Sequence, residues 1–246
     1  MPKTNEIWIS AFSLNSWLNA KSWSCFLSTC QDAMKATLVR LDVNDPVRRK
    51  AESVEDSARY ICSLDPGSSR WVFGTFSNRS LMEIVIASPQ MGTPNALTMT
   101  FPSKKGEFDL ETISLIFEAA NTILDPFYSL CDLQERITEK KKLTGAIDFE
   151  CELAGMFWLT YFNRSYRDFV GYEKIALLSP KDYSSGGVSV RLGADPTQLD
   201  VSTRRDAEYR FGKELFVDPQ DESFKRRGAH ALRFDQLRRE MTNTET

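Results

Sequence analysis

The chain has a single histidine, His230, and this scarcity removes several kinds of chemistry. A metal site built from several histidines is excluded, and a nucleophile–base pair would have to recruit His230 from near the C-terminus. No serine or carboxylate pattern surrounds this residue. We therefore interpret His230 as an ordinary surface histidine.

Motifs that hold phosphate groups are also missing. The sequence has no GxGxxG, and the Ser184–Gly187 segment (SSGG) lacks both the spaced glycines and the lysine of a Walker motif. The GxSxG elbow of α/β-hydrolases is absent as well. Ser184–Gly187 is therefore predicted to be a plain turn.

Cysteines are few, odd in number and without a CxxC pair; they are Cys25, Cys30, Cys62, Cys131 and Cys151. This pattern favours buried free thiols in a reducing compartment over disulfides. The N-terminal sequence MPKTNEIWISAF has neither the apolar core nor the cleavage site of a secretion signal. No apolar run approaches the roughly 20 residues needed to cross a bilayer. We expect a cytoplasmic protein.

The charge balance is slightly acidic, with a net charge of -3 and an isoelectric point near 5.4. Proteins that bind nucleic acid usually carry a basic domain, so this balance argues against that class. It is compatible with a protein partner that is itself basic. A chain of 246 residues is long enough for one large domain or two small ones.

The first third of the chain predicts two amphipathic helices. Steps of three and four residues join the first set of apolar positions, with Asn15 or Ser16 as the opening residue and Asn44-Asp45-Pro46 as the stop. A second face runs from Val47 to Ile61. The positions are Trp23, Phe26, Leu27, Cys30, Met34, Leu38 and Leu41 in the first helix, then Val47, Ala51, Val54, Ala58 and Ile61 in the second.

Strands are predicted next. Arg70–Phe76, Leu81–Ala87 and Ala96–Phe101 are short, β-prone and separated by turn residues, which indicates a three-stranded antiparallel meander. Asp109 is placed to cap a helix whose apolar face runs from Leu110 to Leu124.

The second half mixes strands and helices. The predicted strands are Ile147–Leu153, Met156–Phe162 and Val188–Leu192, and Phe127–Leu133 is either a strand or a helical turn. The predicted helices are a charged surface helix at Gln134–Thr144, a helix that begins at Asn163–Ser165 and a helix that includes Ala207–Leu215. The helix that begins at Asn163–Ser165 is expected to bury Tyr166, Phe169, Val170 and Leu177.

This order predicts an α+β fold with a mainly antiparallel sheet covered by helices and an N-terminal helical pair. We divide the chain into an N-terminal helical segment at 1–66, an α+β domain at 67–218 and a charged C-terminal tail at 219–246.

A row of carboxylates is the clearest candidate site. Asp148, Glu150 and Glu152 alternate with apolar residues, so they share one face of the predicted strand. One interpretation is the solvated face of a half-buried strand. The other is an acidic ladder presented to a positive partner or a divalent cation, since three like charges on one face repel one another. Metal-dependent nucleases carry a lysine two residues after such an acid, in the pattern acid-x-Lys. No lysine follows Glu150 or Glu152 at this spacing, so the row does not indicate an endonuclease.

Two other clusters favour structural interpretations. The cations Lys225, Arg226, Arg227, Arg233, Arg238 and Arg239 are interleaved with carboxylates, as in a solvated tail. The aromatic residues Trp158, Tyr161, Phe162 and Tyr166 lie on a strand whose pattern already requires core packing. We therefore expect no cofactor, no resident metal and no nucleic-acid partner.

The segment Ala154–Asn163 (AGMFWLTYFN) resembles the "GWLTYL" strand of bacterial polymorphic-toxin immunity proteins, in particular the immunity protein 52 family. The helix leading into Asp125-Pro126, the strand Gly187–Leu192 and the loop at Asp195-Pro196 are similar to that family in the same order. The resemblance covers roughly residues 68–217. The N-terminal helices and the basic tail depart from it.

This resemblance implies a protein without enzymatic activity that binds a cognate secreted toxin, often a nuclease, and neutralises it by direct contact. Asp148, Glu150 and Glu152 would then be partner-binding residues, because alternate strand positions lie about 6.5–7 Å apart and mimic phosphate spacing. Two alternatives stay open. One is a secretion-system adaptor or chaperone, and the other is a metal-dependent enzyme that uses the carboxylate row.

Overall fold

A computed structural model describes residues 6–64, 69–87, 93–103, 107–144, 153–216, 232–233 and 236–237. The chain divides into two compact units, Met1–Ser129 and Leu130–Thr246. Both combine helices with antiparallel strand pairs, which confirms the α+β prediction.

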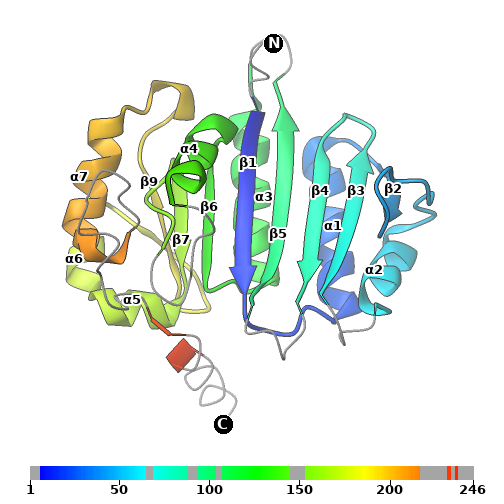
Figure 1. Ribbon diagram of the computed structural model, residues 1–246, viewed down its shortest axis with the longest axis horizontal. Coiled ribbons are helices and arrows are strands. Elements are labelled where there is room, and N and C mark those ends of the chain that lie inside the picture. The colour runs from blue at the N-terminus through cyan, green and yellow to red at the C-terminus, as the bar shows by residue number, and fades with distance from the viewer. Residues whose placement is uncertain are drawn as a thin grey trace. The chain divides into compact units, whose positions relative to one another are not determined.

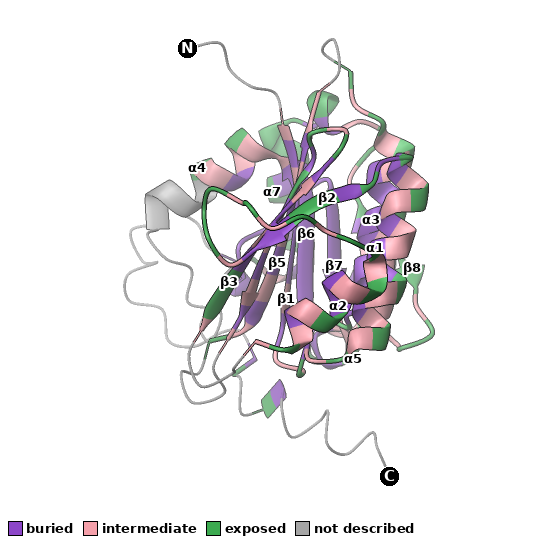
Figure 2. Cartoon of the chain, turned by 90° about the vertical axis from the view of Figure 1, so that its right-hand side faces the viewer, coloured by how far each residue is buried: buried purple, intermediate pink, exposed green. Residues whose placement is uncertain are grey.

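The first unit is a five-stranded antiparallel sheet with helices on one side. Its strands follow the order β2-β3-β4-β5-β1 (Figure 1), and α1, α2 and α3 cover one face of them (Figure 2). The elements are β1 (Glu6–Ser13), α1 (Ala20–Met34), β2 (Leu38–Asp42), α2 (Val54–Cys62), β3 (Arg70–Phe76), β4 (Leu81–Ile86), β5 (Asn95–Pro102) and α3 (Leu110–Ile123).

The predicted meander is confirmed. Strands β3, β4 and β5 pair in sequence, and β1 adds to β5 on the other side. Asp109 caps α3 as predicted, because its carboxylate accepts the backbone N–H of Thr112 at 3.0 Å.

The N-terminal helical pair is wrong in part, because the stretch also supplies two strands. Helix α1 is capped by Asn19, not by Asn15 or Ser16, and it ends at Lys35, which has a left-handed backbone. Leu38 and Leu41 belong to β2. A β-bulge between Leu38 and Arg40 lets both leucines face the core although they are three residues apart, and that spacing imitates a helical step.

The second predicted helix begins later than expected. Helix α2 starts after its cap Ser53, and the preceding residues run along the outer edge of β2 instead. The N–H of Leu41 donates to the carbonyl of Arg49 at 3.0 Å, and Ala51 N–H donates to the Val39 carbonyl at 3.1 Å. This segment covers the edge of the sheet and satisfies its backbone groups.

The second unit orders its strands β6-β7-β9-β8. The first two residues of β6, Tyr128 and Ser129, are the last two residues of the first unit. The elements are β6 (Tyr128–Leu133), α4 (Gln134–Thr144), β7 (Leu159–Phe162), α5 (Arg164–Val170), α6 (Tyr172–Ala176), β8 (Lys181–Asp182), β9 (Val188–Arg191), the 3-10 helix η2 (Pro196–Gln198), α7 (Val201–Gly212) and the 3-10 helix η3 (Lys213–Leu215).

The predicted strand at Met156–Phe162 is confirmed only from Leu159 onward. Met156, Phe157 and Trp158 are fully buried but irregular. Their N–H groups donate to side-chain oxygens of Glu208, Thr160 and Asp132, respectively, so this backbone is satisfied without a β-ladder.

The predicted helix that includes Ala207–Leu215 is present as α7, which begins at Val201, followed by η3. Two residues of the helix predicted after Asn163 differ from expectation: Phe169 and Leu177 are exposed, whereas Tyr166 and Val170 are buried as predicted. Of the predicted strand Ile147–Leu153, residues 147–152 lie outside the described residues. No helix in the described part of the chain is long and apolar enough to span a bilayer.

Candidate functional site

The carboxylate row of Asp148, Glu150 and Glu152 lies outside the described residues, and so does His230. Within the described ranges, no group of three or more histidine, cysteine or acidic side chains is arranged to hold a metal ion. Cys25, Cys30, Cys62 and Cys131 are free thiols. Cys30 and Cys131 are buried as predicted, whereas Cys25 is exposed and Cys62 is half-buried.

The aromatic residues predicted to pack in the core do so. Trp158, Tyr161, Phe162 and Tyr166 are completely buried. Phe162 stacks on Phe211 of α7 with ring centroids 4.3 Å apart, which ties β7 to that helix. These rings fill the interior of the second unit.

A buried charge cluster in the second unit was not predicted. The carboxylate of Asp132, at the end of β6, is completely buried and accepts N–H groups from Leu133 at 2.7 Å and Trp158 at 3.2 Å. It also pairs with the Arg136 guanidinium at 3.1 Å. Arg204 of α7 contributes a second nearby positive charge. Burial raises the pKa of Asp132, and the arginine charges oppose that rise.

The arginines of this cluster hold the surrounding backbone. Arg136 also donates to the carbonyls of Pro196, the first residue of η2, and Leu199, the residue after it. Burial lowers the pKa of Arg204. Because every described contact in this cluster is internal to the second unit, we interpret the cluster as a structural clamp.

The candidate site that faces solvent is on the first unit. Strand alternation turns Trp71, Phe73 and Thr75 of β3 away from α1, α2 and α3, and Leu81, Glu83 and Val85 of β4 lie beside them in register. Together with Val39 of β2, these residues form what we call the open face: Val39, Trp71, Phe73, Thr75, Leu81, Glu83 and Val85.

Large apolar side chains of the open face remain accessible. Trp71 is 49% exposed, Leu81 48% and Val39 39%. The rings of Trp71 and Phe73 are stacked, with centroids 6.2 Å apart and planes 14° from parallel. Aromatic side chains grouped on an exposed surface are typical of protein-interaction sites.

A hollow of about 660 Å³ adjoins the Phe73 ring. Val39, Phe73 and Leu81 contribute apolar walls, and the loop around Pro46 closes one side. Arg40 lies at this hollow, where its guanidinium donates to the Val47 carbonyl at 3.3 Å. The hollow therefore offers apolar contact area beside a cationic side chain that the loop orients.

Sequence reasoning predicted the strands of the open face but did not identify the face itself. Alternation in β3 and β4 shows which residues share a face, but it does not show which face the helices cover. Trp71 and Phe73 are as β-prone as core residues, so the pattern alone does not distinguish a core face from an exposed one.

No protein-family model matches the chain, and no curated protein matches its sequence. Among solved structures, the fold is similar to that of the Pseudomonas aeruginosa T6SS protein PA0821, with a TM-score of 0.62 and 13% sequence identity. The match covers 87% of this chain and 73% of that chain. The likeness establishes a shared fold.

Proposed function

We propose that this chain is an immunity protein that binds and neutralises a cognate secreted toxin by direct protein–protein contact. The observation that carries the proposal is the fold similarity to a T6SS (type VI secretion system) protein over most of this chain. The sequence resemblance to the immunity protein 52 family points in the same direction. We further propose that the protein has no enzymatic activity and acts in the cytoplasm of the producing cell.

The partner that fits best is a nuclease domain. A nuclease presents positive charge where it holds phosphates, and this chain carries a net charge of -3. Opposite charges accelerate encounter, and aromatic anchors then supply most of the binding free energy. In this proposal the open face provides the anchors, and Asp148, Glu150 and Glu152 provide part of the attraction.

Co-expression with the product of the neighbouring gene in a susceptible host tests the function. We expect the toxin alone to arrest growth, and this chain to restore growth and to co-purify with the toxin. A complex in which the toxin remains active would favour the adaptor or chaperone alternative. Survival that does not depend on this chain, with no complex formed, would remove the immunity proposal.

Variants of the open face test the anchors. We expect Trp71→Ala and Leu81→Ala each to weaken toxin binding at least tenfold, equivalent to about 1.4 kcal/mol, because each removes exposed apolar contact area. Leu115→Ala is the matched control, because Leu115 is 49% exposed but lies on α3, on the opposite side of the sheet. Calorimetric titration of the toxin measures the three affinities. Equal losses in the Leu81 and Leu115 variants would contradict an anchor role for the open face.

The carboxylate row is tested by charge reversal. We expect the triple variant Asp148→Lys, Glu150→Lys, Glu152→Lys to slow association with the toxin at least tenfold at low salt, with a smaller difference at high salt. Stopped-flow fluorescence measures the association rate. An unchanged rate would remove these three residues from the proposed interface.

A further inference from the structure

The hollow of about 660 Å³ at the open face is formed by the sheet together with a loop. Phe73 of β3, Leu81 of β4 and Val39 of β2 supply apolar walls from the sheet. Pro46 and Val47, in the loop that follows β2, supply apolar walls from another side. Apolar side chains therefore reach this hollow from four segments of the first unit.

The loop wall is fixed by hydrogen bonds within the first unit. Asp42, at the end of β2, is buried, and its carboxylate accepts the backbone N–H groups of Arg48 and Arg49 at 3.2 and 3.1 Å. The guanidinium of Arg40 donates to the Val47 carbonyl at 3.3 Å. A binding surface that is ordered in advance loses less conformational entropy on association. The hollow is therefore a preformed recess.

The charged residues of the lining do not select an ion of one sign. They are Arg40, Asp45 and Glu83, so a charged group of either sign would meet a like charge in the hollow. Burial of a charge without a dedicated counter-ion is also costly. Burial of apolar surface against the Val39, Phe73 and Leu81 side chains is favourable. The lining therefore favours an uncharged, apolar occupant.

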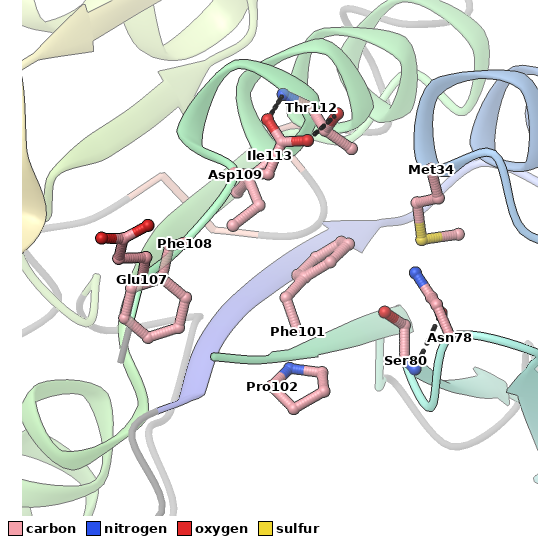
Figure 3. Close-up of a pocket in the computed structure, with 10 residues that line it drawn as sticks. All are labelled: Met34, Asn78, Ser80, Phe101, Pro102, Glu107, Phe108, Asp109, Thr112 and Ile113. Carbon is pink, nitrogen blue, oxygen red and sulfur yellow. Dashed lines mark hydrogen bonds between the residues drawn. The ribbon is translucent and has the colours of Figure 1, made fainter. Parts of the chain in front are cut away.

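A smaller pocket of about 340 Å³ lies where α1 and α3 meet the sheet, and Figure 3 shows Met34, Phe101 and Ile113 in its lining. These three residues belong to the core on the side of the sheet that the helices cover. The Asp109 carboxylate is turned to Thr112, whose N–H it accepts at 3.0 Å (Figure 3). The larger hollow, by contrast, adjoins the exposed side chains of the open face, where a protein partner can reach it.

We propose that the hollow receives a large apolar side chain, aromatic or aliphatic, that projects from the toxin. This inference rests on the proposed function, and it adds the chemistry of the partner's group and the place where that group inserts. Phe73 and Leu81 pack against the inserted side chain, and the Trp71 ring, stacked on Phe73, extends the contact across the open face. Insertion of one anchor into a preformed, water-excluding recess is typical of the residues that dominate binding free energy.

A variant that fills the hollow tests the proposal without removing apolar surface. Thr75 lines the hollow from the outward side of β3, so Thr75→Phe occupies the space that the toxin's side chain would enter. We expect toxin binding to weaken by about tenfold or more, although the variant adds apolar surface to the open face. The matched control is Thr122→Phe, the same change at an exposed position of α3, on the opposite side of the sheet. It should bind within about twofold of wild type.

Biolayer interferometry with the purified toxin measures each affinity, and thermal unfolding verifies that each variant folds. If Thr75→Phe unfolds, Thr100→Phe fills the hollow from β5 instead. Hydrogen exchange of the wild-type chain adds a measurement that needs no variant. The backbone amides of Asp45 and Val47, in the loop wall, should exchange more slowly in the complex than in the free protein.

Equal binding by the filled variant and the Thr122→Phe control would overturn the hollow proposal and leave the immunity function standing. Unchanged exchange of the loop amides in a complex that does form would have the same meaning. A wild-type chain that forms no complex with the toxin would overturn both the hollow proposal and the proposed function.

Discussion

Replacing Asp132 with alanine is expected to destabilise the second unit by about 3–5 kcal/mol, because it leaves buried positive charges without their counter-ion. Arg136 loses its partner at 3.1 Å, and the N–H of Trp158 loses its acceptor. The backbone around η2 is also affected, since Arg136 is the donor that holds it. Urea unfolding measures the change in the free energy of unfolding.

Asp168→Ala is the control for this variant. Asp168 also pairs with arginines, Arg164 and Arg167, but its side chain is 54% exposed. Exposed ion pairs contribute about 0–1 kcal/mol, so the loss should be small. If Asp132→Ala costs no more than Asp168→Ala, the charge cluster is not the clamp that its burial indicates.

The pH dependence of the same residue has a defined sign. Burial raises the pKa of Asp132 above the ordinary value of about 3.9, so between that pH and the folded-state pKa the folded state retains a proton that the unfolded chain has lost. The stability contributed by this group is therefore complete below about pH 3.9 and declines as the pH rises through the folded-state pKa. Relative to Asp132→Asn, which does not titrate, the wild type should lose stability over this window. Urea unfolding at several pH values from 4 to 7 gives the slope, and an opposite slope would refute the assignment.

Trp23→Ala should have an effect of similar size in the first unit, about 3–5 kcal/mol. Trp23 is fully buried in α1 and meets Trp17 and Phe26 edge to face, with ring centroids 5.8 and 5.9 Å apart. Its indole N–H donates to the Trp17 carbonyl at 2.6 Å, and the Trp17 indole donates to the Leu124 carbonyl at 3.0 Å. The two indoles thus connect α1 to the end of α3.

Two further variants separate packing from hydrogen bonding at this position. Trp23→Phe keeps a ring but removes the indole donor, so it should cost less than Trp23→Ala and at least the roughly 1 kcal/mol of one hydrogen bond. Trp71→Ala removes the same side chain from the open face and should change stability by about 0.5 kcal/mol or less. Thermal and urea unfolding compare the three. A Trp23→Ala variant as stable as Trp71→Ala would show that the indole pair does not support the core.

The elements that the sequence predicted well carry local signals. Strands β3, β4 and β5 are bounded by turn residues such as Ser77–Ser80, and α3 starts at a residue whose side chain caps it. The elements it predicted poorly depend on distant partners. Strand β2 looks helical until β3 supplies its register, and Met156–Trp158 look like a strand until side chains from other elements bind their N–H groups.

The candidate site divides in the same way. The row of Asp148, Glu150 and Glu152 was identified because alternation is a local property, and its role stays a prediction. The open face was not foreseen, because Val39, Phe73 and Leu81 come from three separate strands. Their proximity follows only from the pairing of β2, β3 and β4 in the sheet.

Alternation along β3 and β4 also has an evolutionary consequence. Val72, Ile84 and Met82 maintain the core, while Trp71, Phe73 and Leu81 belong to the opposite face of the same strands. Substitutions on the open face leave the packed interior unchanged, so recognition of a partner can diversify without loss of the fold. Under the proposed function, a lineage confronted with an altered toxin would therefore have a short mutational route to a new specificity, through residues that the interior of the fold does not require.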